Sequence, residues 1–404
     1  MRLTIISFLF CFLTTIIYAQ STSPYFPSAE KWEMRRPERV GFDTALLNEA
    51  IRYSQKMESR NSRSMEENHF KSFGKEPHGE PIGPFKDRGA LTGLIIHKGY
   101  IIAEWGEPGR IDMTHSVTKS FLSTLVGLAI QDKRISSVHD TVSKYITTVQ
   151  WIDSSVIPAQ TRTIQPFAGP HNETITWESM LRQSSDWEGT LFSKPDWADR
   201  PDRDSTKWLN RKRNAPGAVF EYNDVRVNAM ALAATVLFKN SLPDVFRERI
   251  MNPIGASSTW KWHGYKTSWI ILGKRKVEVV SGGGHWGGGM FINAYDMARF
   301  GLLTLNDGKW KNKQLIPKNW IAASATPGPA NIGYGYMNYF LNTDQKYIPL
   351  APKTAFVHVG NGTNVVYVDK ENDLVIVLRW IENGSVDEVV GMVLAAIKKN
   401  TEFR

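Results

Sequence analysis

The sequence predicts an α+β fold built around one antiparallel sheet, with a mostly helical lobe inserted between the two halves of that sheet. Strand-like stretches rich in Val and Ile lie near both ends of the chain, before residue 106 and after residue 354. The stretch between them has helical periodicity with many Pro and Gly interruptions. We expect the terminal helices to flank the sheet, and a cleft between the two lobes to hold the functional site.

The order of these patterns defines the expected domain organisation. Residues 20–404 are expected to form a single module. Its sheet-containing lobe would combine about 35–150 with about 280–404, and its helical lobe would cover about 151–279. No internal repeat or heptad run divides the chain further.

Local patterns place the individual elements. Helical spacing of apolar residues predicts helices, in chain order, at 44–57, 227–238, 242–250, 294–305 and 386–399. Runs of β-branched and aromatic residues predict strands at 94–97, 100–105, 277–280, 355–358, 364–368 and 374–380. Lys98-Gly99 joins the first two strands as a hairpin turn. The polar stretch 58–88 is expected to be a surface excursion, and 187–215 a structured loop.

The first 19 residues are typical of a secretory signal peptide. Met1-Arg2 precede an apolar run over residues 3–18, and Ala19 precedes the expected cleavage point. The run is short for a membrane span, so no stable span is expected after cleavage. The only cysteine, Cys11, lies in this run, so the mature chain would have no disulfide and no cysteine metal site. We therefore expect an exported bacterial protein, periplasmic or secreted.

Charge and glycine patterns argue against two classes of partner. The formal net charge is +9, but the basic residues are scattered apart from a cluster at 207–213, so a solvated basic surface is favoured over nucleic-acid binding. The glycines of 282–289 satisfy the spacing of a dinucleotide loop, yet a strand-like piece follows them where that loop would open a helix. Close backbone packing beside a cleft is the better interpretation, and no cofactor or metal is expected.

The segment Ser116-Val117-Thr118-Lys119 carries the strongest chemical signal. It opens a long apolar helix, and residues three apart share one helical face, so Lys119 can reach the hydroxyl of Ser116. Ser116 in the first turn would lie near unpaired backbone N–H groups that favour a developing negative charge. These are the requirements of an activated nucleophile. The same spacing at Ser28 precedes no apolar helix, and the alternative for Ser116 is a plain helix cap with a solvated Lys119.

Three motifs in a fixed order sharpen this interpretation. Ser116-Val117-Thr118-Lys119, Tyr222-Asn223-Asp224 and His358-Val359-Gly360 resemble the S-x-x-K, Y-x-N and K-T-G or H-x-G motifs of the serine β-lactamase and penicillin-binding-protein superfamily. The nearest branch contains class C β-lactamases, D-alanyl-D-alanine carboxypeptidases, family VIII esterases and 6-aminohexanoate-dimer hydrolases. The resemblance covers roughly residues 35–400.

The resemblance implies a role for each motif. Ser116 would be the acylated nucleophile, Lys119 its proton partner, and Tyr222 a base or an acid to the leaving group. As a base, Lys119 would need a pKa lowered by burial and by nearby positive charge.

Other residues would bind the substrate according to the same resemblance. His358 would replace the lysine of K-T-G, and Gly360 would let substrate approach the strand. The backbone N–H of Asn361, with that of Ser116, would form the oxyanion hole.

Two departures from the family pattern bear on the substrate. Asp224 stands where Asn is usual, and an ionised carboxylate accepts hydrogen bonds but cannot donate one to a substrate carbonyl. Val359 stands where Thr or Ser is usual, which removes a hydroxyl partner for a β-lactam carboxylate. Both changes argue against efficient β-lactam turnover.

We therefore expect an exported serine hydrolase that cleaves a small ester or amide through a Ser116 acyl-enzyme. The alternatives are a D-Ala-D-Ala carboxypeptidase or class C-like β-lactamase, and, from another class, a catalytically silent ligand-binding protein on the same scaffold. The sequence leaves the substrate and the oligomeric state open. Candidate cleft walls are residues 186–215, including Asp186, Trp187 and Trp197, together with Trp286, and core packing is the alternative for each tryptophan.

Overall fold

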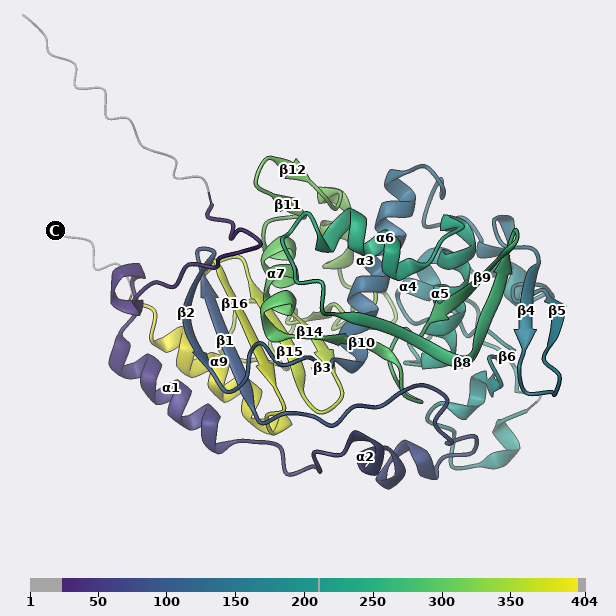
Figure 1. Cartoon of the computed structure of the whole chain (residues 1–404), viewed down its shortest axis with the longest axis horizontal. Coiled ribbons are helices and arrows are strands. Elements are labelled where there is room, and N and C mark those ends of the chain that lie inside the picture. Colours follow the sequence, from purple (N-terminus) through teal and green to yellow (C-terminus); the bar gives the residue numbers. More distant parts are fainter. Residues whose placement is uncertain (1–23, 210, 399–404) are drawn as a thin grey trace, which may run out of the picture.

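The computed structural model describes residues 24–209 and 211–398 (Figure 1). The expected signal peptide, residues 1–19, lies outside the described residues. Within them, no helix combines the length and the apolar character required to cross a membrane. The architecture is α+β, as predicted.

The main sheet is formed by the two ends of the chain. It has six antiparallel strands in the order β13-β14-β15-β16-β1-β2, so the N-terminal hairpin pairs with the last strand. Leu94 on β1 lies opposite Val377 on β16. The strands are β1 (Thr92–His97), β2 (Tyr100–Trp105), β13 (Phe340–Leu341), β14 (Phe356–Gly360), β15 (Asn364–Asp369) and β16 (Leu374–Arg379).

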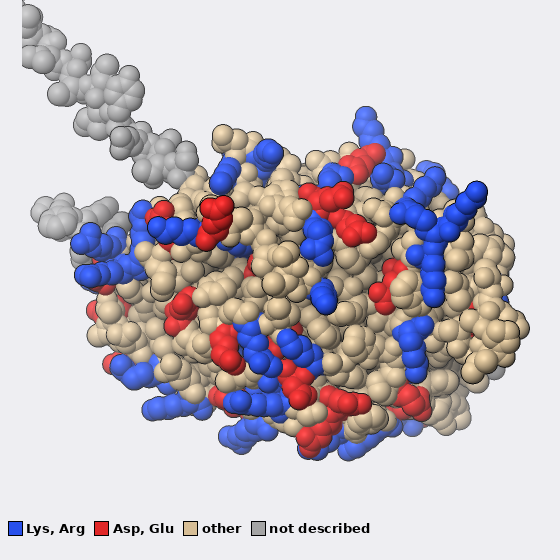
Figure 2. All heavy atoms as spheres, viewed as in Figure 1, with Lys and Arg blue, Asp and Glu red and all other residues tan. Residues whose placement is uncertain are grey.

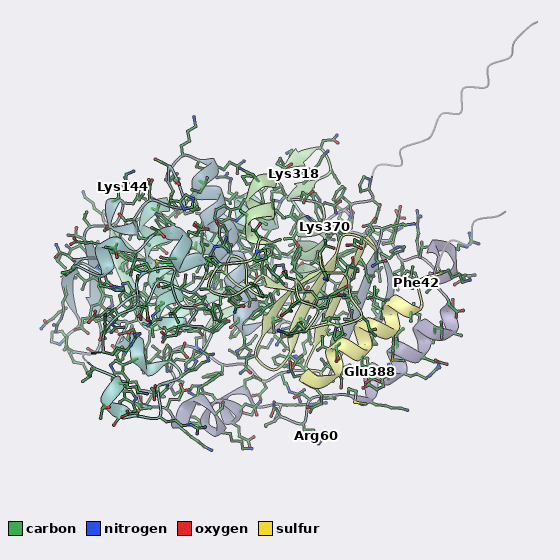
Figure 3. The ribbon with its side chains drawn as sticks, turned by 180° about the vertical axis from the view of Figure 1, so that it is seen from behind. Phe42, Arg60, Lys144, Lys318, Lys370 and Glu388 are labelled. Atoms are coloured by element: carbon green, nitrogen blue, oxygen red, sulfur yellow. The ribbon has the colours of Figure 1, made fainter. Side chains whose placement is uncertain are left out.

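Helices cover both faces of this sheet. On one face lie α1 (Thr44–Lys56) and α9 (Val386–Ala395), whose apolar side chains share a core with Ile95 and Ile376. Figure 3, the view from behind, shows this face of the sheet and labels Glu388 on α9. The Glu388 carboxylate accepts a hydrogen bond from Tyr53 on α1. On the other face lies α7 (Ala294–Leu305), packed against β15 and β16. Burial on both faces explains why the inner strands are almost continuously apolar.

The second lobe contains more strand than the sequence predicted. Its helices are α3 (Thr118–Gln131), α4 (Trp177–Leu181), α5 (Asp224–Phe238) and α6 (Leu242–Phe246). Beside them lies a second sheet of β3 (Asp112–Met113), β10 (Gly289–Ile292), β8 (Lys261–Leu272), β4 (Val149–Asp153) and β5 (Gln160–Ile164), with β9 (Arg275–Val280) paired to β8. The long strand β8 was missed because Gly264 and a register shift before Trp269 interrupt its alternation.

The remaining elements are short. They are α2 (Met65–Lys71), α8 (Lys318–Ser324), β6 (Thr190–Leu191), β7 (Lys194–Pro195), β11 (Lys309–Trp310), β12 (Lys313–Gln314), a π-helical turn at Arg247–Met251, and 3-10 turns at Pro37–Val40, Phe73–Lys75, His115–Val117, Val142–Lys144, Asn172–Thr174, Asp196–Ala198, Ser205–Lys207 and Asn383–Ser385.

The stretch 58–88 is not a simple surface excursion, contrary to expectation. It carries α2, which lies along the lower edge of the molecule in Figure 1, between the two lobes. The amides of Ile82 and Gly83 donate hydrogen bonds to the carbonyl of Trp286 in the glycine-rich segment. Met65 and His69 are buried. The stretch 58–88 is polar in composition, yet part of it is packed against other segments of the protein.

Charged side chains of both signs are interspersed over the face shown in Figure 2. Lys and Arg alternate with Asp and Glu there and form no continuous basic surface. Charges of both signs are therefore mixed on this face, and the expected solvated basic surface stays a prediction.

Candidate active site

The nucleophile motif lies at the start of the buried helix α3. His115–Val117 forms a 3-10 turn that leads into α3, where twelve of fourteen side chains are buried. Lys119 Nζ donates a hydrogen bond to Ser116 Oγ at 2.8 Å, as the three-residue spacing predicts. The Lys119 side chain has no exposed surface, whereas Ser116 is half-buried and lines a cleft. His115 adopts a left-handed φ of 47°, which turns the chain sharply just before the serine.

Tyr222 faces the same cleft from the segment that precedes α5. The centre of its ring lies 4.7 Å from Lys119 Nζ. Burial, and next the negative charge of Asp224, raise the pKa of its phenol well above the ordinary value, while a hydrogen bond with Ser116 acts in the opposite direction. The phenol therefore keeps its proton at neutral pH and is suited to donate it.

Asp224 does not reach the cleft as a substrate-binding residue. Its Oδ1 lies 2.6 Å from Lys119 Nζ, and the two side chains are 3% and 0% exposed. Burial alone would raise the pKa of this carboxyl, but Lys119, Arg200 and His285 outweigh that effect and hold it below its usual range. As the first residue of α5, Asp224 also lies at the positive end of that helix. The position that is usually Asn is here one half of a buried ion pair.

The glycine-rich segment closes over this ion pair. A Cβ atom added at Gly283 would lie 2.1 Å from Lys119 Nζ and 2.5 Å from Asp224 Oδ2. A side chain here is therefore incompatible with the Lys119–Asp224 contact. The expected close backbone packing is present, and Gly283 packs against the Lys119–Asp224 pair.

Gly283→Ala is expected to lower the rate of Ser116 acylation about 100-fold, because a displacement of order 1 Å in a catalytic group has an effect of that size. Labelling by a fluorophosphonate, followed by intact mass, measures this rate. Gly384→Ala is the matched control, since nothing lies within 4 Å of a Cβ at that glycine. Equal labelling of the two variants would contradict the proposed closure over the ion pair.

Behind Asp224 lies a chain of polar contacts that sequence reasoning missed. The Asp224 backbone N–H donates to the Asp199 carboxylate, which also contacts Arg200 and, at 3.2 Å, Nδ1 of His285. Nε2 of His285 lies 2.8 Å from Glu76. These residues come from three separate loops, so no motif could reveal them.

Glu76, Asp199 and His285 form a cluster of metal-ligand type within the described residues. Each nitrogen of the His285 ring already faces a carboxylate, so a cation bound to either nitrogen would have to replace the contact made there. The geometry is that of an imidazole bridging two acids.

Gly360 and Asn361 lie at the expected edge of β14. A Cβ at Gly360 would lie 2.1 Å from the carbonyl oxygen of Thr114 and 3.2 Å from the Ser116 nitrogen. The glycine thus admits the backbone beside Ser116. Gly360 also lines the Ser116 cleft, and the approach of substrate to this strand stays a prediction. Asn361 is exposed and lines the same cleft as Ser116, which is compatible with the expected oxyanion hole.

His358 lies away from the cleft, which corrects the expected substrate-binding role. Its side chain is fully buried, with Nδ1 2.9 Å from Ser120 Oγ and the ring against Tyr339. Neighbouring side chains of a strand point to opposite faces, and it is Val359 that lines the cleft. Burial lowers the pKa of His358 to about 3.

This burial predicts a pH-dependent stability. His358 is neutral in the folded protein but gains a proton in the unfolded chain below its ordinary pKa, so the unfolded state binds more protons between about pH 6.5 and pH 3. Stability is complete above this window and falls with pH inside it. Between pH 7 and pH 5, the unfolding free energy of the wild type is expected to fall by about 2 kcal/mol more than that of His358→Gln. Urea denaturation at the two pH values measures it, and an unchanged pH dependence would contradict the prediction.

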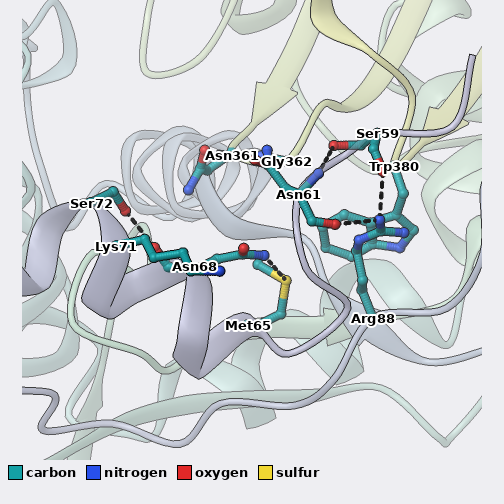
Figure 4. A pocket seen from close by; sticks show the side chains of 10 residues that line it. All are labelled: Ser59, Asn61, Met65, Asn68, Lys71, Ser72, Arg88, Asn361, Gly362 and Trp380. Atoms are coloured by element: carbon teal, nitrogen blue, oxygen red, sulfur yellow. Dashed lines mark hydrogen bonds between the residues drawn. The ribbon is translucent and has the colours of Figure 1, made fainter.

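The cleft around Ser116 has a volume of about 360 Å³. A neighbouring pocket of about 250 Å³ shares four of its lining residues, Ser59, Asn61, Asn361 and Gly362 (Figure 4). In Figure 4, Asn361 and Gly362 lie on one side of this second pocket, with Asn68 and Met65 of α2 below them. The stretch 58–88 thus extends the Ser116 cleft along α2.

The predicted cleft walls are mostly core residues. Trp187 and Trp286 are 2% and 0% exposed, and Asp186 is buried in an ion pair with Arg226 at 2.8 Å. Trp197 is half-buried and stacks on Trp208. None of the four belongs to the residues that line the Ser116 cleft, but Arg200, from the same predicted stretch 186–215, does line it.

A serine, a lysine and a tyrosine converge at the start of a buried helix, as in serine hydrolases of the β-lactamase type. The β-lactamase family matches residues 113–391, more than half of the 404 residues. The chain belongs to this family, and the resemblance to the serine β-lactamase and penicillin-binding-protein superfamily is confirmed. No curated protein matches the sequence significantly.

Solved structures share the fold. A protein assigned as a β-lactamase from Bacteroides dorei is 15% identical with a TM-score of 0.55, over 89% of this chain and 100% of the other. A penicillin-binding-protein homologue from Caulobacter crescentus is 12% identical with a TM-score of 0.53, over 89% and 98%. EstCE1, described as a hydrolase with promiscuous acyltransferase activity, is 12% identical with a TM-score of 0.53, over 88% and 99%. Identities this low show the fold alone.

Proposed function

We propose that the protein cleaves a small ester or amide through an acyl-enzyme on Ser116. Two successive contacts carry this proposal. Lys119 Nζ donates a hydrogen bond to Ser116 Oγ at 2.8 Å and forms an ion pair with Asp224 Oδ1 at 2.6 Å. The serine is open to the cleft, while the lysine and the aspartate are shielded from water. A nucleophile linked to a buried proton acceptor is the arrangement that covalent catalysis requires.

Lys119 and Asp224 act in this proposal as one proton-accepting pair. As Ser116 Oγ attacks the substrate carbonyl, its proton passes to Lys119 Nζ, and Lys119 releases another proton to the Asp224 carboxylate. Lys119 ends as an ammonium and Asp224 as a neutral acid, while the negative charge moves to the oxygen of the tetrahedral intermediate. The neighbouring cations keep the Asp224 carboxylate ionised in the resting site, so it can accept a proton when negative charge develops on the substrate.

Tyr222 donates the proton that the leaving group needs. The C–O or C–N bond of the intermediate breaks, the leaving atom takes the phenolic proton, and the Lys119–Asp224 pair returns a proton to Tyr222. Its raised pKa supports this role, because the phenol is protonated in the resting site. Water then attacks the acyl-enzyme by the same route and Ser116 regains its proton.

The main alternative is a D-Ala-D-Ala carboxypeptidase or a class C-like β-lactamase. The observation against it is Val359, which lines the cleft where a hydroxyl would bind a β-lactam carboxylate. We also propose that the protein acts outside the cytoplasm, on the basis of the apolar run at residues 3–18.

A panel of chromogenic substrates tests this function. We expect hydrolysis of 4-nitrophenyl butyrate by the wild type and none by Ser116→Ala, with slower cleavage of the matching nitroanilide and little turnover of a cephalosporin. Fast cephalosporin turnover would favour the β-lactamase alternative. Absence of any Ser116-dependent hydrolysis would favour a silent binding protein.

A further inference from the structure

His285 is a buried histidine that the proposed proton transfers do not use. Its side chain has no exposed surface and does not belong to the lining of the Ser116 cleft. The ring packs against Phe73 and Trp286, with 4.1 Å and 4.4 Å between ring centres. An imidazole in this position does not touch the substrate, so any part it has in the reaction acts through its neighbours.

Both nitrogens of the His285 ring contact carboxylates. Nε2 lies 2.8 Å from Glu76 Oε2, and Nδ1 lies 3.2 Å from Asp199 Oδ1. A neutral imidazole donates a hydrogen bond through one nitrogen alone, whereas the cationic ring donates through both. An ionised carboxylate only accepts. The two contacts together are therefore those of a cationic ring held between two acids.

The Asp199 carboxylate links His285 to the Lys119–Asp224 pair. Its Oδ2 accepts a hydrogen bond from the backbone N–H of Asp224, the first residue of α5. Burial raises the pKa of Asp199, and the positive charges of His285 and Arg200 act against that rise. An ionised carboxylate is a stronger acceptor than a neutral acid, so a cationic His285 strengthens the bond that fixes the Asp224 backbone.

We infer that His285 is a positioning residue, which holds Asp199 on the Asp224 amide and thereby keeps the Asp224 carboxylate beside Lys119. The inference rests on the proposed function, in which Asp224 accepts a proton from Lys119 at a contact of 2.6 Å. Glu76 anchors the opposite side of the ring. The stretch 58–88, which carries Glu76 and Phe73, thus contributes to the geometry of the proton acceptor from outside the cleft.

A double-mutant cycle tests whether His285 acts through Asp224. At pH 7 we expect His285→Gln to lower kinact, the limiting rate constant of Ser116 labelling by a fluorophosphonate, at least about 10-fold. KI, the half-saturating concentration of the label, should not change, because His285 lies outside the cleft lining. In the Asp224→Asn background the same substitution should change kinact less than about 2-fold, since the carboxylate that it positions is absent.

A matched control and a stability measurement make the result specific. His139→Gln removes a histidine that pairs with Glu178 at the surface, and kinact should stay unchanged in both backgrounds. Thermal denaturation of each variant shows whether it is folded. A ring that only fills space would slow labelling by the same factor with Asp224 and with Asn at that position.

Variants of Glu76 keep the inference testable if His285→Gln does not fold. The Glu76 side chain is 18% exposed, so its truncation leaves no closed cavity. Glu76→Gln keeps an acceptor for the Nε2 proton and Glu76→Ala does not. We expect kinact to decrease in the order wild type, Glu76→Gln, Glu76→Ala, and the effect of Glu76→Ala to disappear in the Asp224→Asn background.

Three outcomes would overturn the positioning role alone, because Ser116 would still be labelled. They are a wild-type kinact in His285→Gln, the same loss in both Asp224 backgrounds, and a wild-type kinact in Glu76→Ala. A wild-type protein that does not react with the fluorophosphonate would instead overturn the proposed function, and with it the basis of this inference.

Discussion

Asp224→Asn is expected to move the acid limb of Ser116 acylation to higher pH. In the wild type, burial raises the pKa of Asp224, but the neighbouring cations outweigh this effect and hold the pKa low. The Asp224 carboxylate therefore stays ionised as the pH falls. Asparagine cannot take a proton, and the variant has to use Lys119 in its neutral form alone. At pH 6 we expect acylation at least about 100-fold slower than in the wild type, within the range that general-base catalysis contributes.

The rate of fluorophosphonate labelling between pH 4 and pH 10 measures this shift. The difference between the two labelling rates should narrow as the pH rises, because a neutral lysine can accept the serine proton without the carboxylate. Asp132→Asn, which removes a surface carboxylate paired with Arg249, is the control and should follow the wild type. Superimposable profiles for wild type and Asp224→Asn would show that Lys119 works without the aspartate.

Lys119→Arg is expected to slow acylation by about 1,000-fold while keeping the protein folded. Arginine preserves the positive charge beside Asp224, but its guanidinium does not release a proton at accessible pH. The variant thus separates proton transfer from charge pairing. Labelling kinetics measure the first and thermal denaturation the second.

Lys119→Met provides the complementary variant. It leaves the Asp224 carboxylate buried without its partner, and we expect a loss of about 3–5 kcal/mol of unfolding free energy. Near-wild-type labelling of Lys119→Arg would contradict a role of Lys119 in proton transfer.

The chemistry of the site could be predicted from the sequence wherever it depends on local geometry. Ser116 and Lys119 lie three residues apart on one helix, so backbone periodicity alone brings Oγ and Nζ together. The antiparallel sheet could be predicted for a similar reason, since strands buried on both faces form the apolar runs near both chain ends.

Contacts between distant segments could not be predicted in this way. Asp224 pairs with Lys119 only because α5 begins beside α3. Residues 186–215 were predicted to form a wall of the cleft, but no pattern in that loop singled out Arg200 as the residue that lines it. His358 was assigned to the cleft by its motif, yet strand alternation turns its side chain into the core and Val359 outwards. The strand β8 was missed because Gly264 interrupts its alternation.

The central claim is that Ser116 is an activated nucleophile that forms a covalent adduct. Intact mass of the protein after exposure to a fluorophosphonate, followed by peptide mapping, tests it most directly. The account predicts one adduct per chain, located on Ser116 and absent from Ser116→Ala. A protein that remains unlabelled, or an adduct that persists in Ser116→Ala, would contradict it.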